Sequence, residues 1–70
     1  MTITIFGATG MVGKHLVKQA LYKGYTVRAF GRNVFTAGFD ENEHLQLVQG
    51  ALFDAKGVYD AVKGCDAVFS

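Results

Sequence analysis

Three glycines spaced three residues apart stand between two different sequence periodicities. Gly7, Gly10 and Gly13 follow the alternating run Thr2–Phe6 and precede a helical pattern. Glycine permits backbone conformations that a Cβ would block, and it lets a bound group approach the main chain closely. The first turn of a helix adds unpaired N–H groups and the positive end of its dipole, which favour phosphate oxygens. These residues therefore predict a turn that binds the diphosphate of a dinucleotide.

The elements around this turn give the glycine pattern its meaning, because three spaced glycines alone are a weak signal in a chain with nine of them. Apolar residues recur at helical spacing from Met11 to Lys23, and Gly24 is expected to end that helix. Asp54 is expected to cap a later helix that Gly64 closes. The other expected elements are strands at 25–30, 45–49 and 65–69, a short helix or loop at 34–44, and the capped helix at 55–63.

The order of these elements is βαβαβαβ, which predicts an α/β fold. We expect a Rossmann-like, doubly wound parallel sheet in the spatial order 3-2-1-4, with the first two helical segments on one face and the third on the other. The fourth strand would then be an exposed apolar edge. Residues 1–70 are accordingly expected to be the amino-terminal half of a larger domain, or to complete their sheet by self-association through that edge.

Composition and charge exclude several kinds of partner. Seven Lys and Arg residues against six Asp and Glu residues give a formal net charge of +1, so no footprint for nucleic acid or an anionic membrane surface is expected. The apolar runs are only a few residues long, and the first residues lack the pattern of a secretory signal. A single cysteine, Cys65, fits a reducing compartment, and we expect a cytoplasmic protein.

Four stretches of the chain carry a resemblance to a known family. They are residues 5–13 (IFGATGMVG), 24–33 (GYTVRAFGRN), 48–50 (VQG) and 62–70 (VKGCDAVFS). Together they resemble the NAD(P)H-binding, atypical or extended branch of the short-chain dehydrogenase/reductase superfamily. Within that branch the chain looks most like the small flavin reductase and biliverdin reductase type and the NmrA-like proteins. The resemblance specifies the cofactor half and says little about the substrate.

The same resemblance implies roles for individual residues. It places five residues against the diphosphate: Gly7, Thr9, Gly10, Met11 and Val12. It implies that Gly13 lets the helix pack tightly on the sheet and that Arg32 contacts the adenine and the 2′-phosphate. The family commonly has Gly-Asp after the third strand, where this chain has Gly50-Ala51. The adenine is then expected to be held by stacking, by Leu52 and by backbone groups, with lower affinity.

The end of the second strand also indicates which cofactor is preferred. NAD-binding domains of this kind usually place a carboxylate there to accept from the ribose 2′-OH. No acidic residue occurs between Tyr25 and Ala37, whereas Arg32 offers a planar fork of donors that suits a phosphate. NADP is therefore expected to be preferred over NAD, although a solvated loop arginine is the alternative reading of Arg32.

No catalytic residue and no metal ligand are expected in this chain. Tyr59 and Lys63 have the Tyr-x-x-x-Lys spacing of many dehydrogenases of this superfamily, but they precede the fourth strand, so we interpret the match as coincidence. His15 and His44 lack metal-ligand spacing. Cys65 is expected to be a small buried residue at a strand start.

Two classes of function remain open. The first is an oxidoreductase in which this segment binds NAD(P)H and hydride passes to a flavin, quinone or similar acceptor held by the rest of the protein. The second, which the NmrA-like resemblance permits, is a non-catalytic regulator that senses NADP. An isomerase of the sugar-nucleotide epimerase kind is a distant third.

Overall fold

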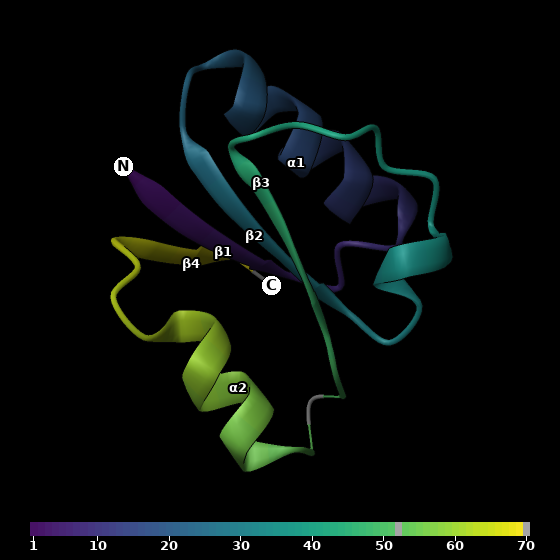
Figure 1. The fold of residues 1–70 in the computed structure, drawn as a ribbon, viewed down its shortest axis with the longest axis vertical. Coiled ribbons are helices and arrows are strands. Elements are labelled where there is room, and N and C mark those ends of the chain that lie inside the picture. The colour runs from purple at the N-terminus through teal and green to yellow at the C-terminus, as the bar shows by residue number, and fades with distance from the viewer. Residues whose placement is uncertain (52, 70) are drawn as a thin grey trace.

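The computed structural model describes residues 1–51 and 53–69 of the chain. In chain order its elements are β1 (Thr2–Phe6), α1 (Met11–Tyr22), β2 (Thr26–Gly31), the 3-10 turn η1 (Val34–Thr36), β3 (Leu45–Gln49), α2 (Ala55–Val62) and β4 (Ala67–Phe69). They alternate as the sequence predicts (Figure 1).

The four strands form one parallel sheet in the order β3-β2-β1-β4, which confirms the predicted topology. Helix α1 and η1 lie on one face of the sheet, and α2 lies on the other (Figure 1). Strands β1, β2 and β3 run from upper left to lower right in that view, so their carboxyl ends share one edge of the molecule. Ligands of doubly wound sheets bind beyond this edge.

The hydrophobic core lies between the sheet and α1. Ile3 and Ile5 of β1 pair with Val27 and Ala29 of β2, and all four are buried. Helix α1 packs on them with Val17 and Ala20, and η1 adds Val34. A strand's alternate side chains point to opposite faces, so one face of β1 and β2 supplies this core while the other faces α2.

Helix α2 is attached to the other face largely by polar contacts. Thr4 Oγ1, which is fully buried, donates to the carbonyl oxygen of Ala61 at 2.6 Å. Arg28 Nη1 donates to the same carbonyl oxygen at 3.2 Å and to that of Lys63. These oxygens belong to the last turn of α2, where a cation complements the helix dipole. Ala61 is the buried residue of this helix, and its side chain offers only a small apolar surface. The hydrogen bonds from Thr4 and from the charged Arg28 add to that contact.

The predicted boundaries hold to within about two residues, as is usual for helix and strand ends. Asp54 is the N-cap of α2, as predicted, and Gly24 and Gly64 follow the two helices with positive φ. The fourth strand is shorter than predicted and begins at Ala67. Cys65 therefore precedes it and is only half-buried, which corrects the expectation of a buried residue at a strand start.

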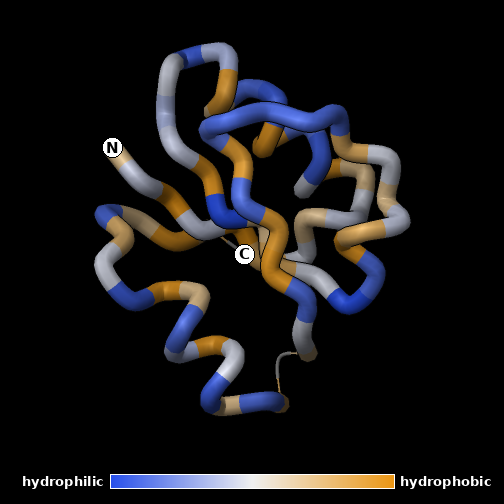
Figure 2. The backbone as a smooth tube through the Cα atoms, viewed as in Figure 1, coloured by the Kyte–Doolittle hydropathy of each residue, from blue (hydrophilic) through white to orange (hydrophobic). Residues whose placement is uncertain are grey.

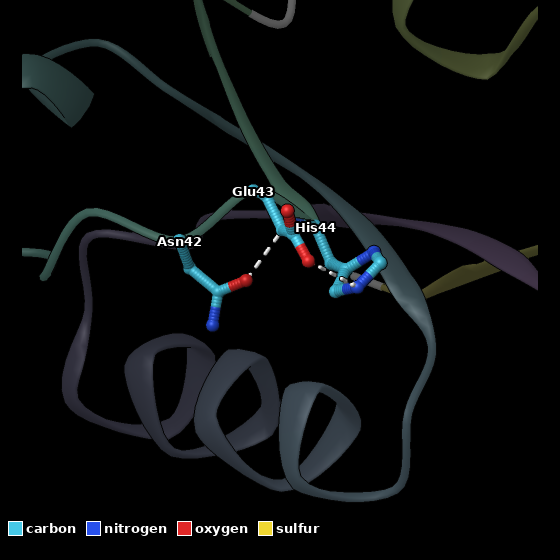
Figure 3. Close-up of polar contacts among 3 residues, drawn as sticks. All are labelled: Asn42, Glu43 and His44. Carbon is cyan, nitrogen blue, oxygen red and sulfur yellow. Dashed lines mark hydrogen bonds and ion pairs between the residues drawn. The ribbon is translucent and has the colours of Figure 1, made fainter.

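The connection between β2 and β3 contains little regular structure. After η1 the chain becomes hydrophilic only toward β3 (Figure 2), and the connection ends in a turn formed by Asn42, Glu43 and His44 (Figure 3). Asn42 Oδ1 accepts from the His44 N–H at 2.8 Å, and His44 Nε2 lies 3.4 Å from Glu43 Oε1. The His44 carbonyl then accepts from the Val27 N–H, so this turn fixes the register of β3. A groove of about 450 Å³ lies between this loop and α1.

Candidate functional site

The glycine turn, residues 7–13, joins β1 to α1 at the carboxyl edge of the sheet. Gly7 has φ of +68°, a left-handed conformation that residues with a Cβ rarely adopt. The Gly10 N–H donates to the Gly7 carbonyl at 3.1 Å and closes the turn. The Ala8 N–H donates to the Phe30 carbonyl of β2 at 3.2 Å, which holds the turn against the neighbouring strand.

Gly13 lies directly against the start of this turn. A Cβ on Gly13 would overlap the Gly7 carbonyl oxygen and would lie 2.8 Å from the Ala8 Cα. Both atoms belong to the backbone, so neither can move without displacing the turn. A glycine at this position therefore lets α1 approach the end of β1 closely.

The amino terminus of α1 is left open. Its N-cap residue is Gly10, which has no side chain to accept a hydrogen bond, and its first turn contains no acidic residue. The Lys14 N–H is bonded to the Gly10 carbonyl at 2.9 Å, so the N–H groups of Met11, Val12 and Gly13 precede the helix's own hydrogen-bond ladder.

The second helix of the same chain is capped in the usual way. Asp54 Oδ1 accepts from the Gly57 N–H at 3.2 Å at the start of α2. The Asp54 side chain thus caps the amino terminus of α2. Among the described residues, no side chain caps the amino terminus of α1. Backbone donors left at a helix amino terminus, with the positive end of its dipole, form an anion-binding site.

Two large apolar side chains stand exposed at this open terminus. Met11 is 89% exposed and Val12 is 73% exposed, so neither contributes to the core. Both are residues that the sequence resemblance assigns to the cofactor.

Arg32 follows β2 at the same edge of the sheet. Phe30 pairs with Phe6, and the Phe30 carbonyl accepts from the Ala8 N–H of the glycine turn. Arg32 lies two residues after Phe30, so its backbone is close to that turn. Its side chain is exposed. Within the described residues it pairs with no carboxylate, since the side-chain contact of this kind found there joins His44 to Glu43.

The end of β3 reaches the same edge. The Gly50 N–H donates to the Gly31 carbonyl at 3.2 Å, and Ala51 follows, half-buried. Leu52, the other residue predicted to hold adenine, lies outside the described residues. The Asp54 carboxylate is engaged with the cap of α2, as predicted.

The remaining candidates are spread over the surface. Tyr59 is 60% exposed on α2, and Lys63 is the residue that ends that helix. His15 lies on the solvent side of α1, where its Nε2 is 3.4 Å from Gln19 Nε2. Residues 1–51 and 53–69 contain no cluster of three metal-ligating side chains, and none of their helices has the length and apolar character to cross a membrane.

One residue of this edge was not singled out from the sequence. Gly31 is the last residue of β2, and the Thr9 side chain of the glycine turn packs against it. The available signal was a glycine directly after the predicted strand 25–30, which the structure includes in β2, where a glycine often marks the close approach of another backbone or a ligand.

A parallel sheet in the order 3-2-1-4, with a glycine turn leading into an uncapped helix at its carboxyl edge, defines a dinucleotide-binding α/β domain of the Rossmann type. A family model described as NAD(P)H-binding matches residues 7–70. The chain belongs to this NAD(P)H-binding family.

The chain is also similar to individual known proteins. Sterol-4-alpha-carboxylate 3-dehydrogenase, decarboxylating, of Mus musculus is 39% identical over 66 residues, covering 94% of this chain and 17% of that protein. A photosystem II assembly factor of Trieres chinensis is 37% identical over 68 residues, covering 97% of this chain and 21% of that protein. The structure of a wide-type short-chain dehydrogenase/reductase from Veillonella parvula, in complex with NADP, has a TM-score of 0.89 at 22% identity, covering 96% of this chain and 33% of that one.

The family model confirms the predicted NAD(P)H-binding family, and the solved structure confirms the predicted fold. The chain is an NAD(P)H-binding segment with a Rossmann-like fold, and the proteins to which it is similar include a dehydrogenase and a short-chain dehydrogenase/reductase. It spans about a fifth of the length of the two relatives and about a third of the solved structure.

Proposed function

We propose that residues 1–70 form the amino-terminal half of an NAD(P)-binding Rossmann domain that prefers NADP to NAD. The observation that carries this proposal is the uncapped start of α1 above the glycine turn, beside the exposed Arg32. The turn offers backbone donors to the diphosphate, and Arg32 offers a guanidinium fork to the 2′-phosphate.

Each predicted site residue has a place in this proposal. The residues against the diphosphate are Gly7, Thr9, Gly10, Met11 and Val12. Gly13 allows the close packing of α1, and Ala51 borders the adenine together with Arg32; Leu52, which is also expected at the adenine, lies outside the described residues. The backbone geometry of the turn supports the first group, because the conformation of Gly7 and the open N–H groups of α1 are what a bound diphosphate requires.

The preference for NADP is supported by charge. Residues 25–37 contain no acidic side chain that could accept from a ribose 2′-OH. Among the described residues, no carboxylate forms an ion pair with Arg32.

We propose further that the whole protein transfers hydride from the nicotinamide to an acceptor, in the manner of the flavin reductase type. The dehydrogenase among the relatives supports this class of reaction. The present residues supply binding and orientation of the cofactor, and the catalytic residues belong to the other half of the domain. The single cysteine of the chain supports a location in the reducing cytoplasm.

The second candidate function is an NmrA-like regulator in which NADP occupancy changes a partner interface. The relative that is an assembly factor rather than a named enzyme favours it. Steady oxidation of NADPH by the whole protein with a flavin or quinone acceptor would support the first function. Cofactor binding without turnover would support the second.

For residues 1–70 by themselves, we propose self-association through the β4 edge, which is the alternative to completion of the sheet by a following half of the domain. Strand β4 has only three residues and pairs with β1 on one side. Val68 and Phe69 are each 47% exposed, so pairing with another copy would bury apolar surface as well as backbone groups.

Titration of the ¹⁵N-labelled chain with NADP and NAD, followed by NMR, tests the cofactor proposal. We expect the amide signals of residues 9–13 to shift, with tighter binding of NADP. Gly10→Val is the matched negative control, because a bulky side chain there blocks the ligand while helical content is retained. Shifts confined to other parts of the chain, or equal binding by Gly10→Val, would contradict the proposal.

A further inference from the structure

The last residue of β2 lies against the glycine turn. A Cβ on Gly31 would lie 2.9 Å from Thr9 Cγ2, whereas Thr9 Oγ1 and Cβ would be 3.7 and 3.8 Å away. Gly31 is buried and Thr9 is half-buried. The methyl group of Thr9 therefore occupies the space that any side chain at position 31 would need.

This contact restricts the Thr9 side chain. A β-branched residue has few χ1 rotamers, and rotation of Thr9 to relieve a clash would swing its hydroxyl away from its present direction. The alternative is a displacement of the turn itself, which is also tied to β2 by the bond from the Ala8 N–H to the Phe30 carbonyl. Either response changes the groups that the turn presents at the edge of the sheet.

We infer that Gly31 is a positioning residue for the dinucleotide site. Because it has no side chain, Thr9 seats against β2, and the glycine turn keeps a fixed position relative to Arg32, the residue that follows Gly31. This inference rests on the proposed function, since it concerns how the same site holds its ligand. It also gives a reason for glycine at a buried strand position, where glycine costs conformational entropy and adds no packing.

Gly31→Ala tests the inference in the ¹⁵N-labelled chain. We expect the affinities for NADP and NAD to fall together by about tenfold, because the displaced turn serves the diphosphate that both ligands share. Gly57→Ala is the matched control. Its Cβ would lie 2.9 Å from Asp54 Oδ2 on α2, an equally close approach away from the turn, and we expect both affinities to stay unchanged.

Rescue by a second substitution separates positioning from a general loss of stability. Thr9→Ser removes Cγ2 and keeps the hydroxyl, so the closest approach of residue 9 to the Cβ introduced by Gly31→Ala would become an ordinary contact. We expect the double variant Thr9→Ser/Gly31→Ala to bind within about twofold of Thr9→Ser alone. The loss of affinity in Gly31→Ala arises from the contact between its Cβ and Thr9 Cγ2, and Thr9→Ser removes that contact. Unchanged binding by Gly31→Ala, or no rescue, would overturn the inference while leaving the proposed function intact. Failure of the wild-type chain to bind either dinucleotide would overturn both.

A measurement without substitutions covers the case in which Gly31→Ala does not fold. Three-bond couplings to the Thr9 methyl carbon report its χ1 rotamer, and we expect a single rotamer with a nuclear Overhauser contact from that methyl to the Gly31 α-protons. Rotamer-averaged couplings or an absent contact would overturn the inference.

Discussion

The hydroxyl of Thr4, in the middle of β1, donates a 2.6 Å hydrogen bond to the carbonyl oxygen of Ala61, 57 residues later in the chain. The same oxygen accepts from Arg28 of β2, so two neighbouring strands hold the end of α2. A buried hydroxyl is costly unless it is hydrogen-bonded, and here the helix terminus supplies an acceptor that its own ladder leaves unused. The contact thus satisfies both groups and docks α2 on the sheet.

Thr4→Val is expected to lower the free energy of unfolding by about 1 kcal/mol, because it removes this bond at nearly constant volume. Urea unfolding followed by circular dichroism measures the change. Thr26→Val, at the half-buried start of β2, is the matched control and is expected to change stability by less than about 0.5 kcal/mol. Equal effects of the two substitutions would show that the Thr4 bond contributes nothing specific.

Gly13→Ala is expected to cost about 3 kcal/mol of stability, since its Cβ would meet backbone atoms of Gly7 and Ala8 that cannot move independently. Gly10→Ala is the control three residues earlier. Its Cβ would lie 3.6 Å from the Gly7 carbonyl oxygen, an ordinary contact, so this variant is expected to fold normally. Thermal unfolding of both variants checks the difference, and a stable Gly13→Ala protein would contradict it.

Arg32→Ala is expected to weaken NADP binding by about tenfold or more and to leave NAD binding unchanged, because a charge-assisted contact with the 2′-phosphate is lost. Titrations of both dinucleotides against the wild type and the variant measure the two ratios. Lys23→Ala removes an equal charge from the far end of α1 and controls for the general electrostatic effect. If NADP and NAD bind equally in wild type and variant, Arg32 is a solvated loop residue.

Ala51→Asp is expected to tighten binding of both dinucleotides, because a carboxylate beside the end of β3 would accept from the adenine amino group. Titration with 5′-AMP isolates the adenosine half of the ligand. An unchanged affinity would mean that the adenine side of the site is closed in another way.

Val68→Lys is expected to prevent self-association of the 7.6 kDa chain, since a lysine on an edge strand opposes pairing with another copy. Size-exclusion chromatography with light scattering measures the mass. Gln46→Lys places the same charge on β3 at the opposite edge and is expected to leave the association intact. A monomeric wild-type chain would refute the proposed β4 interface.

The order of the sheet was expected from the fold class that an alternating strand and helix pattern favours. The sequence by itself determined the alternation of strands and helices and the position of the glycine turn. These features depend on periodicity and on residues close together in the chain, such as Asp54, which caps a helix three residues away. Local preferences act over this range, so the chain displays them directly.

Only the tertiary structure decided which distant residues meet. Thr4 and Arg28 read as ordinary strand residues, and their partner Ala61 lies 57 and 33 residues away. Gly31 follows the predicted strand 25–30, and nothing along the chain shows that the Thr9 methyl group of another segment occupies the space where a Cβ of residue 31 would lie. Such contacts depend on the space between packed elements, and a pattern along the chain carries no measure of that space.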